Sequence, residues 1–528
     1  MERRFWRARA VFLASWATAV LAAPSVWAAE FFVDPMAGSA MGDGSAAKPW
    51  STLEQVAKDG AFGAKIKAGD TVWLRSGYHG APVLAGGDFN PPIVIAAAAG
   101  AKPTASQVSF KGAKGWTLRG LSVSPSYAPT PAVVTMVTFD AASTRVVFED
   151  SELFSVADAS SWGADEWINA ASSGISVKGA DITVRNNNLT NVRFGISVEG
   201  AGALIDRNRV VDFSADGMRG LGDNGVFQYN LIKNVHVDDA AGDANHDDGF
   251  QSWSVGPGGV GTGVVKGVVL RGNVFINRDD PNQKLPNAMQ GIGCFDGMFE
   301  GWVVENNVVI TDHWHGISFY GMRSSRIVNN TVIDVNDVKP GPPWIMVTAH
   351  KDGTPSQDVI VRNNLATDYT LEGTNITDDH NTTLTDLSMF FVDPAKFDLH
   401  LLPGAPAVDT GSANQAPALD IEGIPRPQGK GVDLGAYEWH EPTVTPPDGG
   451  IGGSGGEGPG QPDASAPGTG GQGGAGGEGG GGSSPGTSSG CGCAVEERTP
   501  PHQAWALLAL AIGLLGRRAR RARRALIR

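Results

Sequence analysis

Seven segments of the form apolar-x-x-Asn-x-apolar recur through the middle of the chain and constrain its fold more than any other feature. Their spacing is about 22 residues, with three longer intervals. A period in this range is typical of a solenoid, in which each turn packs only on its neighbours. The segments centre on Asn187, Asn208, Asn230, Asn273, Asn307, Asn330 and Asn364.

A glycine motif runs ahead of these asparagines, at Gly174, Gly195, Gly217, Gly249, Gly291 and Gly316. Short alternating strands, separated by Gly and Asn turns with no helix between them, indicate parallel coils rather than βαβ units. We therefore expect an all-β fold, a solenoid formed by a single chain. Stacked Asn side chains at one corner are expected to bond to one another, in a left-handed backbone that Asn tolerates.

Both ends of this solenoid carry segments that we expect to cap it. The spacing of Ser51-Thr52-Leu53-Glu54 is that of a capping box and predicts a short helix from Thr52 to Lys58. The following segment, Thr71 to Leu74, is expected to form the first strand.

Segments near both ends of the body resemble secreted pectate-lyase-like β-helices. The resemblance covers about residues 31–440 and implies a right-handed parallel β-helix with a short N-terminal capping helix. This fold hosts lyases, hydrolases, epimerases and adhesins, so it does not fix the activity. The N-terminal segments are residues 31–35, 42–45, 49–50 and 69–72, and the C-terminal ones are residues 397–401, 404–409, 426–427 and 433–438.

The first 28 residues are expected to be a cleaved signal peptide. Four arginines precede a mostly apolar run from Val11 to Ala23, which is short for a membrane span. Val26-Trp27-Ala28 then offers a small residue at each of the two positions that a signal peptidase reads. The alternative is an N-terminal membrane anchor. The body, residues 29–440, is therefore expected to be exported.

The other end of the chain divides into a linker and a tail. Residues 441–490 are almost all Gly, Pro, Ser and acidic residues, a composition that cannot form a core. Residues 491–528 contain Cys491-Gly492-Cys493, an apolar stretch and an arginine cluster. This order resembles the myxobacterial C-terminal sorting tail, which implies processing at the cell surface. A plain membrane anchor is the alternative, and in both cases the tail is the only expected contact with a membrane.

The charge of the chain limits its partners. The chain has 55 acidic and 41 basic residues, a formal net charge of −14, and many of its arginines lie in the two terminal segments. Nucleic acid is therefore not an expected partner. Cys294 is the only Cys outside the tail, so no disulfide within the body is expected, and it is predicted to be a buried apolar residue. We expect a monomer.

Aligning the glycine motifs predicts which side chains face outward on consecutive turns. The residue after each Gly is expected to face the core, and its alternate neighbours to face solvent. The early turns then show an ordinary polar surface, whereas the later ones bring together Asp216, Arg219, Asp248, Gln251, Gln290 and His315. Trp253, Phe295 and Tyr320 form an aromatic row, suited either to sugar rings or merely to shielding the sheet.

The expanded turn from Asp238 to Trp253 holds the densest polar cluster of the chain. Because it is long, acidic and contains His, we expect it to be functional rather than a solvated loop. His246 is expected to join His315 on one face of the solenoid. Carboxylates at this density also suit Ca²⁺, with candidate ligands Asp243, Asp247 and Asp248.

Three functions stay open at this point. A lyase or epimerase acting on a uronic acid needs a base (His246 or His315), a cation for the enolate (Arg219 or Ca²⁺) and a proton donor (Tyr320). A glycoside hydrolase needs two carboxylates, Asp216 and Asp248. A glycan-binding adhesin needs only the substrate contacts, Gln251, Trp253, Gln290 and Phe295. We expect a surface-displayed, carbohydrate-active protein acting on an extracellular polysaccharide, with the lyase or epimerase slightly favoured.

Overall fold

A computed structural model describes residues 28–236, 245–286, 288–336 and 338–441. The described residues belong to one compact unit. Apart from residues 28 and 441, the predicted signal peptide, linker and tail lie outside the described residues, as does Asp243. None of the helices in the described ranges is both long and apolar enough to cross a membrane.

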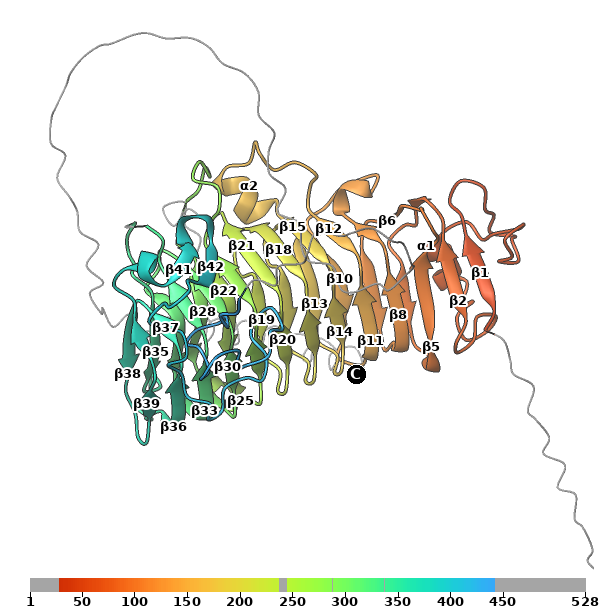
Figure 1. Ribbon diagram of the computed structural model, residues 1–528. Coiled ribbons are helices and arrows are strands. Elements are labelled where there is room, and N and C mark those ends of the chain that lie inside the picture. Colours follow the sequence, from red (N-terminus) through yellow and green to blue (C-terminus); the bar gives the residue numbers. More distant parts are fainter. Residues whose placement is uncertain (1–27, 237–244, 287, 337, 442–528) are drawn as a thin grey trace, which may run out of the picture. The chain divides into compact units, whose positions relative to one another are not determined.

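The described body is a parallel β-helix whose short strands stack into three sheets (Figure 1). The chain visits the sheets in turn, and each strand pairs in parallel with the equivalent strand of the next turn. The 11-stranded sheet contains β4 (Val83–Ala85), β7 (Val108–Lys111), β10 (Thr135–Phe139), β13 (Ser173–Val177), β16 (Ile196–Val198), β19 (Met218–Gly220), β22 (Asp248–Trp253), β28 (Gln290–Asp296), β32 (His315–Tyr320), β35 (Trp344–Thr348) and β38 (Asp368–Leu371).

The other two parallel sheets complete each turn. The 12-stranded sheet contains β3 (Gly77–Tyr78), β6 (Pro103–Ala105), β9 (Ser122–Val123), β12 (Glu152–Phe154), β15 (Asn188–Val192), β18 (Arg209–Phe213), β21 (Leu231–Val235), β27 (Val274–Ile276), β31 (Val308–Ile310), β34 (Thr331–Ile333), β37 (Leu365–Ala366) and β40 (Thr382–Thr383). The 15-stranded sheet contains β1 (Glu30–Val33), β2 (Thr71–Leu74), β5 (Asp88–Ala97), β8 (Lys114–Arg119), β11 (Thr144–Glu149), β14 (Thr183–Arg185), β17 (Leu204–Asp206), β20 (Val226–Gln228), β25 (Val264–Lys266), β26 (Val269–Arg271), β29 (Met298–Glu300), β30 (Val303–Glu305), β33 (Met322–Val328), β36 (Gln357–Arg362) and β39 (Thr377–Asp379).

The core lies inside the coil, as the glycine motifs predict. The residues that follow the motif glycines are buried and belong to one continuous apolar cluster: Ile175, Ile196, Met218, Phe250, Ile292 and Ile317. Cys294 is also fully buried, in agreement with the prediction. Because successive side chains of a strand point to opposite faces, the residues that alternate with these core residues form the outer surface.

The predicted asparagine ladder is present and runs one turn further, to Asn381. Each side-chain Nδ2 donates to the Oδ1 of the next Asn over 2.9–3.1 Å. The prediction was wrong about the backbone, because the left-handed residue is the one before each ladder Asn. These residues, with φ of 53–60°, are Asn186, Arg207, Tyr229, Gly272, Asn306, Asn329 and Asn363.

Removing one ladder side chain is expected to cost at least about 2 kcal/mol of folding free energy. In Asn273→Ala, the backbone carbonyl of Phe227 and the amides of Asn230 lose buried partners. The midpoint of denaturant unfolding measures the cost. Asn282→Ala, at an exposed position, serves as the control and should change stability by less than about 0.5 kcal/mol. Equal effects of the two substitutions would contradict this account.

An alternating column of charges runs beside the ladder on the 15-stranded sheet. Its members pair in register from turn to turn. Within it, Glu149 pairs with Arg185 at 2.6 Å, and Glu305 with Arg271 at 2.6 Å. The column reads Arg119, Glu149, Arg185, Asp206, Gln228, Arg271, Glu305, Val328, Arg362 and Asp379.

The N-terminal end is capped as predicted, with one correction. Helix α1 (Leu53–Lys58) has Thr52 as its N-cap, whose side chain accepts a bond from the amide of Gln55. Leu53 and Val56 are buried against the coil. Thr71–Leu74 is β2 rather than the first strand, because β1 pairs in parallel outside it.

The C-terminal part of the body packs on the outer face of the 12-stranded sheet. A hairpin of β41 (Phe391–Asp393) and β42 (Asp398–Leu401) joins a second apolar cluster there, which includes Ile310, Ile333 and Leu434. This packing explains why β31 and β34 are buried on both faces.

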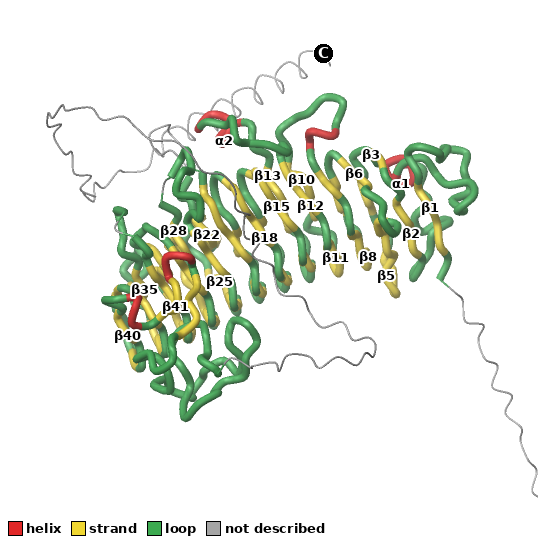
Figure 2. The backbone as a smooth tube through the Cα atoms, turned by 45° about the horizontal axis from the view of Figure 1, so that its top comes forward, coloured by secondary structure: helices red, strands yellow, loops and turns green. Residues whose placement is uncertain are grey.

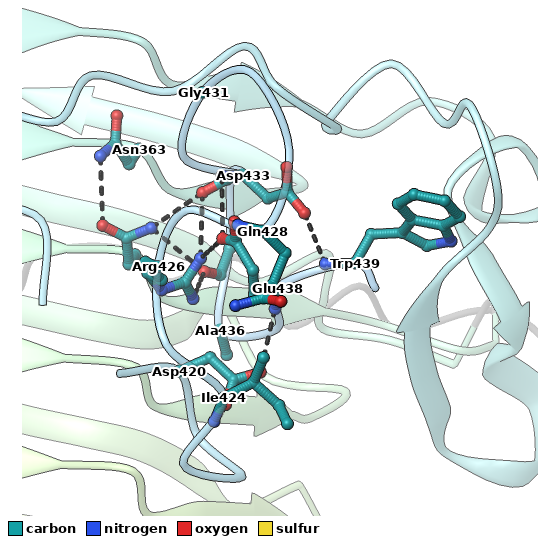
Figure 3. Close-up of polar contacts among 12 residues, drawn as sticks. Asn363, Asp420, Ile424, Arg426, Gln428, Gly431, Asp433, Ala436, Glu438 and Trp439 are labelled. Atoms are coloured by element: carbon teal, nitrogen blue, oxygen red, sulfur yellow. Dashed lines mark hydrogen bonds and ion pairs between the residues drawn. The ribbon is translucent and has the colours of Figure 1, made fainter. Parts of the chain in front are cut away.

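The segment that follows is held by a buried ion pair (Figure 3). Arg426 Nη1 lies 2.6 Å from Glu438 Oε2, and the two side chains are 1% and 0% exposed. Arg426 also donates to the carbonyls of Asp433 and Gly435. Burial and the nearby carboxylate of Glu438 contribute to raising the pKa of Asp433 to about 6.

Long connections enter the 11-stranded sheet before β10, β13, β22, β28 and β35, always from the 12-stranded sheet. One of them carries helix α2 (Ala164–Asn169), which lies at this edge of the body (Figure 2). The amino ends of these strands are therefore bordered by long connections rather than by tight turns. On the opposite edge, a small hairpin of β23 (Val255–Gly256) and β24 (Gly259–Val260) follows β22.

Candidate functional site

Strands β19, β22, β28 and β32 align most of the predicted site residues. Arg219, Gln251, Gly293 and Ser318 occupy equivalent positions on consecutive turns. Asp248 is the equivalent of Gln290. The predicted aromatic row is partly wrong, since a register shift after Ser252 pairs Trp253 with Asp296 instead of Phe295.

Asp216 and Arg219 form an ion pair in which the carboxylate is completely buried and the guanidinium is 20% exposed. Asn245 joins the pair: its Nδ2 donates to Asp216 Oδ1 and its Oδ1 accepts from Arg219 Nη2, both at 3.1 Å. Burial raises the pKa of Asp216, against the lowering effect of Arg219. The carboxylate therefore serves to fix Arg219, which is the partner that can reach a ligand.

Two aromatic rings hold the Arg219 guanidinium. Its Cζ lies 4.1 Å from the ring centroid of Phe194 and 5.2 Å from that of Trp253. These cation–π contacts restrict a side chain that would otherwise be mobile. Trp253, predicted to contact substrate directly, thus also positions Arg219.

Asp248 is fully buried beside Asp216. Its backbone amide donates to Asp216 Oδ1 at 3.2 Å, and its Oδ2 accepts from Gln251 Nε2 at 2.8 Å. Burial and the carboxylates of Asp216 and Asp247 raise its pKa well above the usual range. The uncharged form of Asp248 is therefore favoured relative to an exposed carboxyl.

A missing side chain at Gly293 makes room for this acid. A Cβ atom there would lie 2.1 Å from Asp248 Oδ1 and 2.7 Å from Phe295 Cε2. Among the described residues, Asp248 Oδ1 has no hydrogen-bond partner, and the same holds for Gln290 Oε1. Both oxygens are buried, one on β22 and one on the paired strand β28. Each can accept a hydrogen bond, and Asp248 can also donate one when it is protonated.

His315 lies at the start of β32 in contact with polar and aromatic groups. Its Nδ1 is 2.9 Å from Ser318 Oγ and 3.3 Å from Trp344 Nε1, which also donates to Ser318 Oγ. Because an indole N–H can only donate, Nδ1 is favoured as an acceptor. The neutral imidazole then carries its proton on Nε2.

Burial and the neighbouring imidazoles of His313 and His246 lower the pKa of His315 from 6.5 to about 3. His246 and His315, which were predicted to share one face, therefore do interact, and His313 joins them. His246 is exposed, whereas His315 and His313 are partly buried. At neutral pH, His315 can offer a hydrogen bond without bringing a charge.

The tautomer of His315 can be tested directly. At pH 5, ¹⁵N-histidine NMR should show it neutral and protonated on Nε2. Between about pH 6.5 and 3 the unfolded chain binds the proton that folded His315 excludes, so this group makes stability fall as the pH decreases through that window. His315→Gln should flatten the pH dependence of the melting temperature there. An imidazolium at pH 5 would contradict the assignment.

Phe295 links His315 to Tyr320. Its ring centroid is 4.7 Å from that of His315 and 5.3 Å from that of Tyr320, both in edge-on arrangements. Burial raises the pKa of Tyr320, so its phenol stays protonated and can donate. The half-buried rings agree with either aromatic role, shielding or sugar contact.

The predicted Ca²⁺ ligands lie only partly within the described residues. Nowhere in the described ranges are three or more His, Cys, Asp or Glu side chains arranged to hold a metal. Of the predicted ligands, Asp248 and Asp247 are buried, and Asp243 lies outside the described residues. The Ca²⁺ prediction is therefore untested, and no chemical step is assigned to the ion.

Sequence reasoning missed Trp344 as a site residue. It is the register partner of His315 on the next turn. That turn has Pro342-Pro343 in place of the glycine motif, so alignment by glycines ended one turn too early. The only available signal was an aromatic residue at the expected distance from the preceding motif.

The region around this site matches a known family model. The model for the right-handed β-helix region matches residues 173–339. Together with the parallel sheets, it confirms the predicted fold class, a right-handed parallel β-helix. No curated protein matches the chain.

Several solved structures are similar to the chain. A PL6 family polysaccharide lyase from Pseudopedobacter saltans is 13% identical, with a TM-score of 0.42 and coverage of 74% of this chain and 98% of that one. XylC in complex with xylose is 10% identical, with a TM-score of 0.41 and coverage of 64% and 75%. A pectate lyase is 16% identical, with a TM-score of 0.37 and coverage of 78% and 96%.

Proposed function

We propose that the chain is a carbohydrate-active enzyme that acts as a lyase or epimerase on a uronic-acid polysaccharide. One observation carries the proposal: Arg219, His315 and Tyr320 offer hydrogen-bond donors on this face, and the carboxyls of Asp216 and Asp248 lie buried. Arg219, His315 and Tyr320 keep some exposure, whereas Asp216 and Asp248 have 1% and 0%. The carboxylates of a polyanionic substrate need hydrogen-bond donors as partners.

The reaction begins at C5 of a uronate, whose proton is acidic because it is α to the carboxyl group. Arg219 and Gln251, neighbours in register, bind this carboxylate and stabilise the enolate that forms. His246, the exposed imidazole, takes the proton. Tyr320 then protonates either the leaving oxygen, which gives an unsaturated product, or the other face of C5, which inverts the sugar.

The remaining residues position these groups. Asp216 fixes Arg219, and Asp248 accepts from Gln251; its raised pKa favours the uncharged form, which would reduce the negative charge beneath an anionic substrate. His315 donates from Nε2 in a similarly uncharged form. Gln290, Trp253 and Phe295 are assigned to sugar contact.

A glycoside hydrolase is the second candidate, because Asp216 and Asp248 are unequal. Asp216 is paired with a cation, and the pKa of Asp248 is raised well above its usual range, which is the pattern of a base or nucleophile beside a general acid. Their complete burial argues against it, since both must reach the glycosidic bond.

The full-length protein should be incubated with polygalacturonate, alginate and hyaluronan, with and without Ca²⁺. We expect either ultraviolet-absorbing unsaturated products or a changed uronate composition by NMR. If no polymer gives either unsaturated products or a changed uronate composition, the proposal is wrong. New reducing ends without unsaturation, lost in Asp248→Asn, would identify a hydrolase. Binding abolished by Trp253→Ala, with His246→Ala and His315→Ala unaltered, would identify an adhesin.

The site of action is part of the same proposal. The charged and apolar pattern of residues 1–28 and the tail of residues 491–528 support export and retention at the cell surface on the linker. The protein released by its host should begin at Ala29. N-terminal sequencing tests this, and an intact Met1 would contradict cleavage.

A further inference from the structure

A cavity separate from the candidate site lies between the 15-stranded sheet and the C-terminal segment. Its volume is about 360 Å³, within the range of small-ligand sites. Strand residues Arg271, Glu305 and Arg326 form one wall, and residues 415–419 form the other. Tyr229 closes one end.

The cavity carries a local excess of positive charge in an acidic protein. Glu305 is shared by two guanidiniums: Arg271 Nε lies 2.6 Å from Oε1 and Arg326 Nη2 lies 3.4 Å from Oε2. Two cations and one carboxylate leave a net charge of +1. The Glu305 side chain is only 5% exposed, so its charge is fully engaged by the two arginines.

One donor in this wall is left over. Arg326 Nε is buried and, among the described residues, has no hydrogen-bond partner. The Arg326 side chain as a whole is 38% exposed, so its guanidinium can still present accessible N–H donors to a ligand. A planar guanidinium suits a carboxylate, which it can contact through two parallel bonds.

The opposite wall is preformed rather than loose. Asn306 Nδ2 donates to the carbonyl of Leu419 at 2.7 Å, and Arg362 Nη1 donates to the carbonyl of Asn414 at 3.0 Å. The amide of Arg426 donates to the carbonyl of Ala418, which ties the wall to the buried ion pair of Figure 3. Preorganised walls lower the cost of binding.

The shape of the cavity depends on one glycine, Gly272, among the left-handed residues that precede the ladder asparagines. Gly272 stands where neighbouring turns have Tyr229 and Asn306, and a Cβ there would lie 2.7 Å from the Tyr229 ring. The Tyr229 ring thus lies over this position and, with Pro417, gives the cavity apolar surface. An aromatic face beside a cation suits a sugar ring that carries an acid group.

We propose that this cavity binds the carboxylate of a monosaccharide-sized sugar acid, such as a hexuronate. A single negative charge neutralises the site, the volume fits one ring, and the partly exposed guanidinium of Arg326 supplies donors. This inference stands independently of the proposed lyase or epimerase activity, because it uses a different sheet and different residues.

Isothermal titration of the full-length protein with glucuronate tests the proposal. We expect saturable binding that weakens with added salt, and no binding of glucose. A short oligouronate distinguishes a free sugar acid from one residue of a polymer, and binding of either supports the carboxylate site. Sulfate that binds as tightly as glucuronate would reduce the cavity to a general anion site and overturn the sugar assignment.

Two variants locate the binding. Arg326→Gln should weaken it at least about tenfold, whereas Arg323→Gln, on the same strand and paired with Glu300 at 2.7 Å, should not. Ala418→Glu, at an exposed wall position, should also abolish binding without touching the charge column. Unchanged affinity in both Arg326→Gln and Ala418→Glu would overturn the proposal, whatever the activity of the other face.

Discussion

Arg219→Lys is expected to lower kcat/KM on the responsive polymer by about 10²- to 10³-fold without unfolding the protein. Lysine keeps the charge but cannot lie flat between the Phe194 and Trp253 rings or bond to Asp216 and Asn245 together. The charge would therefore be present but displaced from the substrate carboxylate. Initial rates of unsaturated product or of composition change measure the effect.

The control for this substitution is Arg209→Lys, at an exposed position on β18, which should leave kcat/KM unchanged. Asp216→Asn should lower activity in the same direction, since it releases Arg219. Because the two residues act as a unit, the double variant should be no worse than the poorer single one. If the kcat/KM of Arg219→Lys lies within twofold of that of the parent, Arg219 has no role in the reaction.

Arg426→Met is expected to destabilise the body by about 3–5 kcal/mol, because it leaves the Glu438 carboxylate buried without its partner. The carbonyls of Asp433 and Gly435 lose a donor as well. The C-terminal segment should then detach from the 12-stranded sheet first. Limited proteolysis should show new cleavage within residues 402–440, and denaturant unfolding should show the loss of stability.

A second substitution separates charge from packing. Adding Glu438→Leu to Arg426→Met removes the unpaired charge, so most of the lost stability should return. Lys396→Ala, which breaks the exposed pair with Asp393, should change stability by no more than about 0.5 kcal/mol. A stable Arg426→Met protein with an uncleaved segment would show that apolar packing alone holds this part of the chain.

The fold could be predicted because its signals repeat. Each ladder Asn and each motif glycine occupies the same place on its turn, so errors at one turn are corrected by its neighbours. The left-handed residue was misassigned by one position because Asn186, Asn306, Asn329 and Asn363 sit directly before ladder asparagines. Where two Asn residues are adjacent, the sequence does not indicate which of them adopts the left-handed backbone conformation.

The site was harder to predict because it departs from the repeat. Column alignment assumes turns of constant strand length, and the irregularity after Ser252 moved Trp253 from the Phe295 position towards Arg219. The burial of Asp216 and Asp248 could not be predicted either, because the alternation of inward and outward residues places both on the surface. Their burial reflects the packing around the amino ends of these strands, which periodicity does not describe.

The alternating charge column limits how this protein can change length. Losing one whole turn at Arg185 would bring Glu149 directly beside Asp206, and losing one at Glu149 would bring Arg119 beside Arg185. The neutral positions Gln228 and Val328 are different, because removing either turn sets an acid against an arginine. Single turns should therefore be lost among homologues only at these two places or next to them, and elsewhere two charged turns should be lost together.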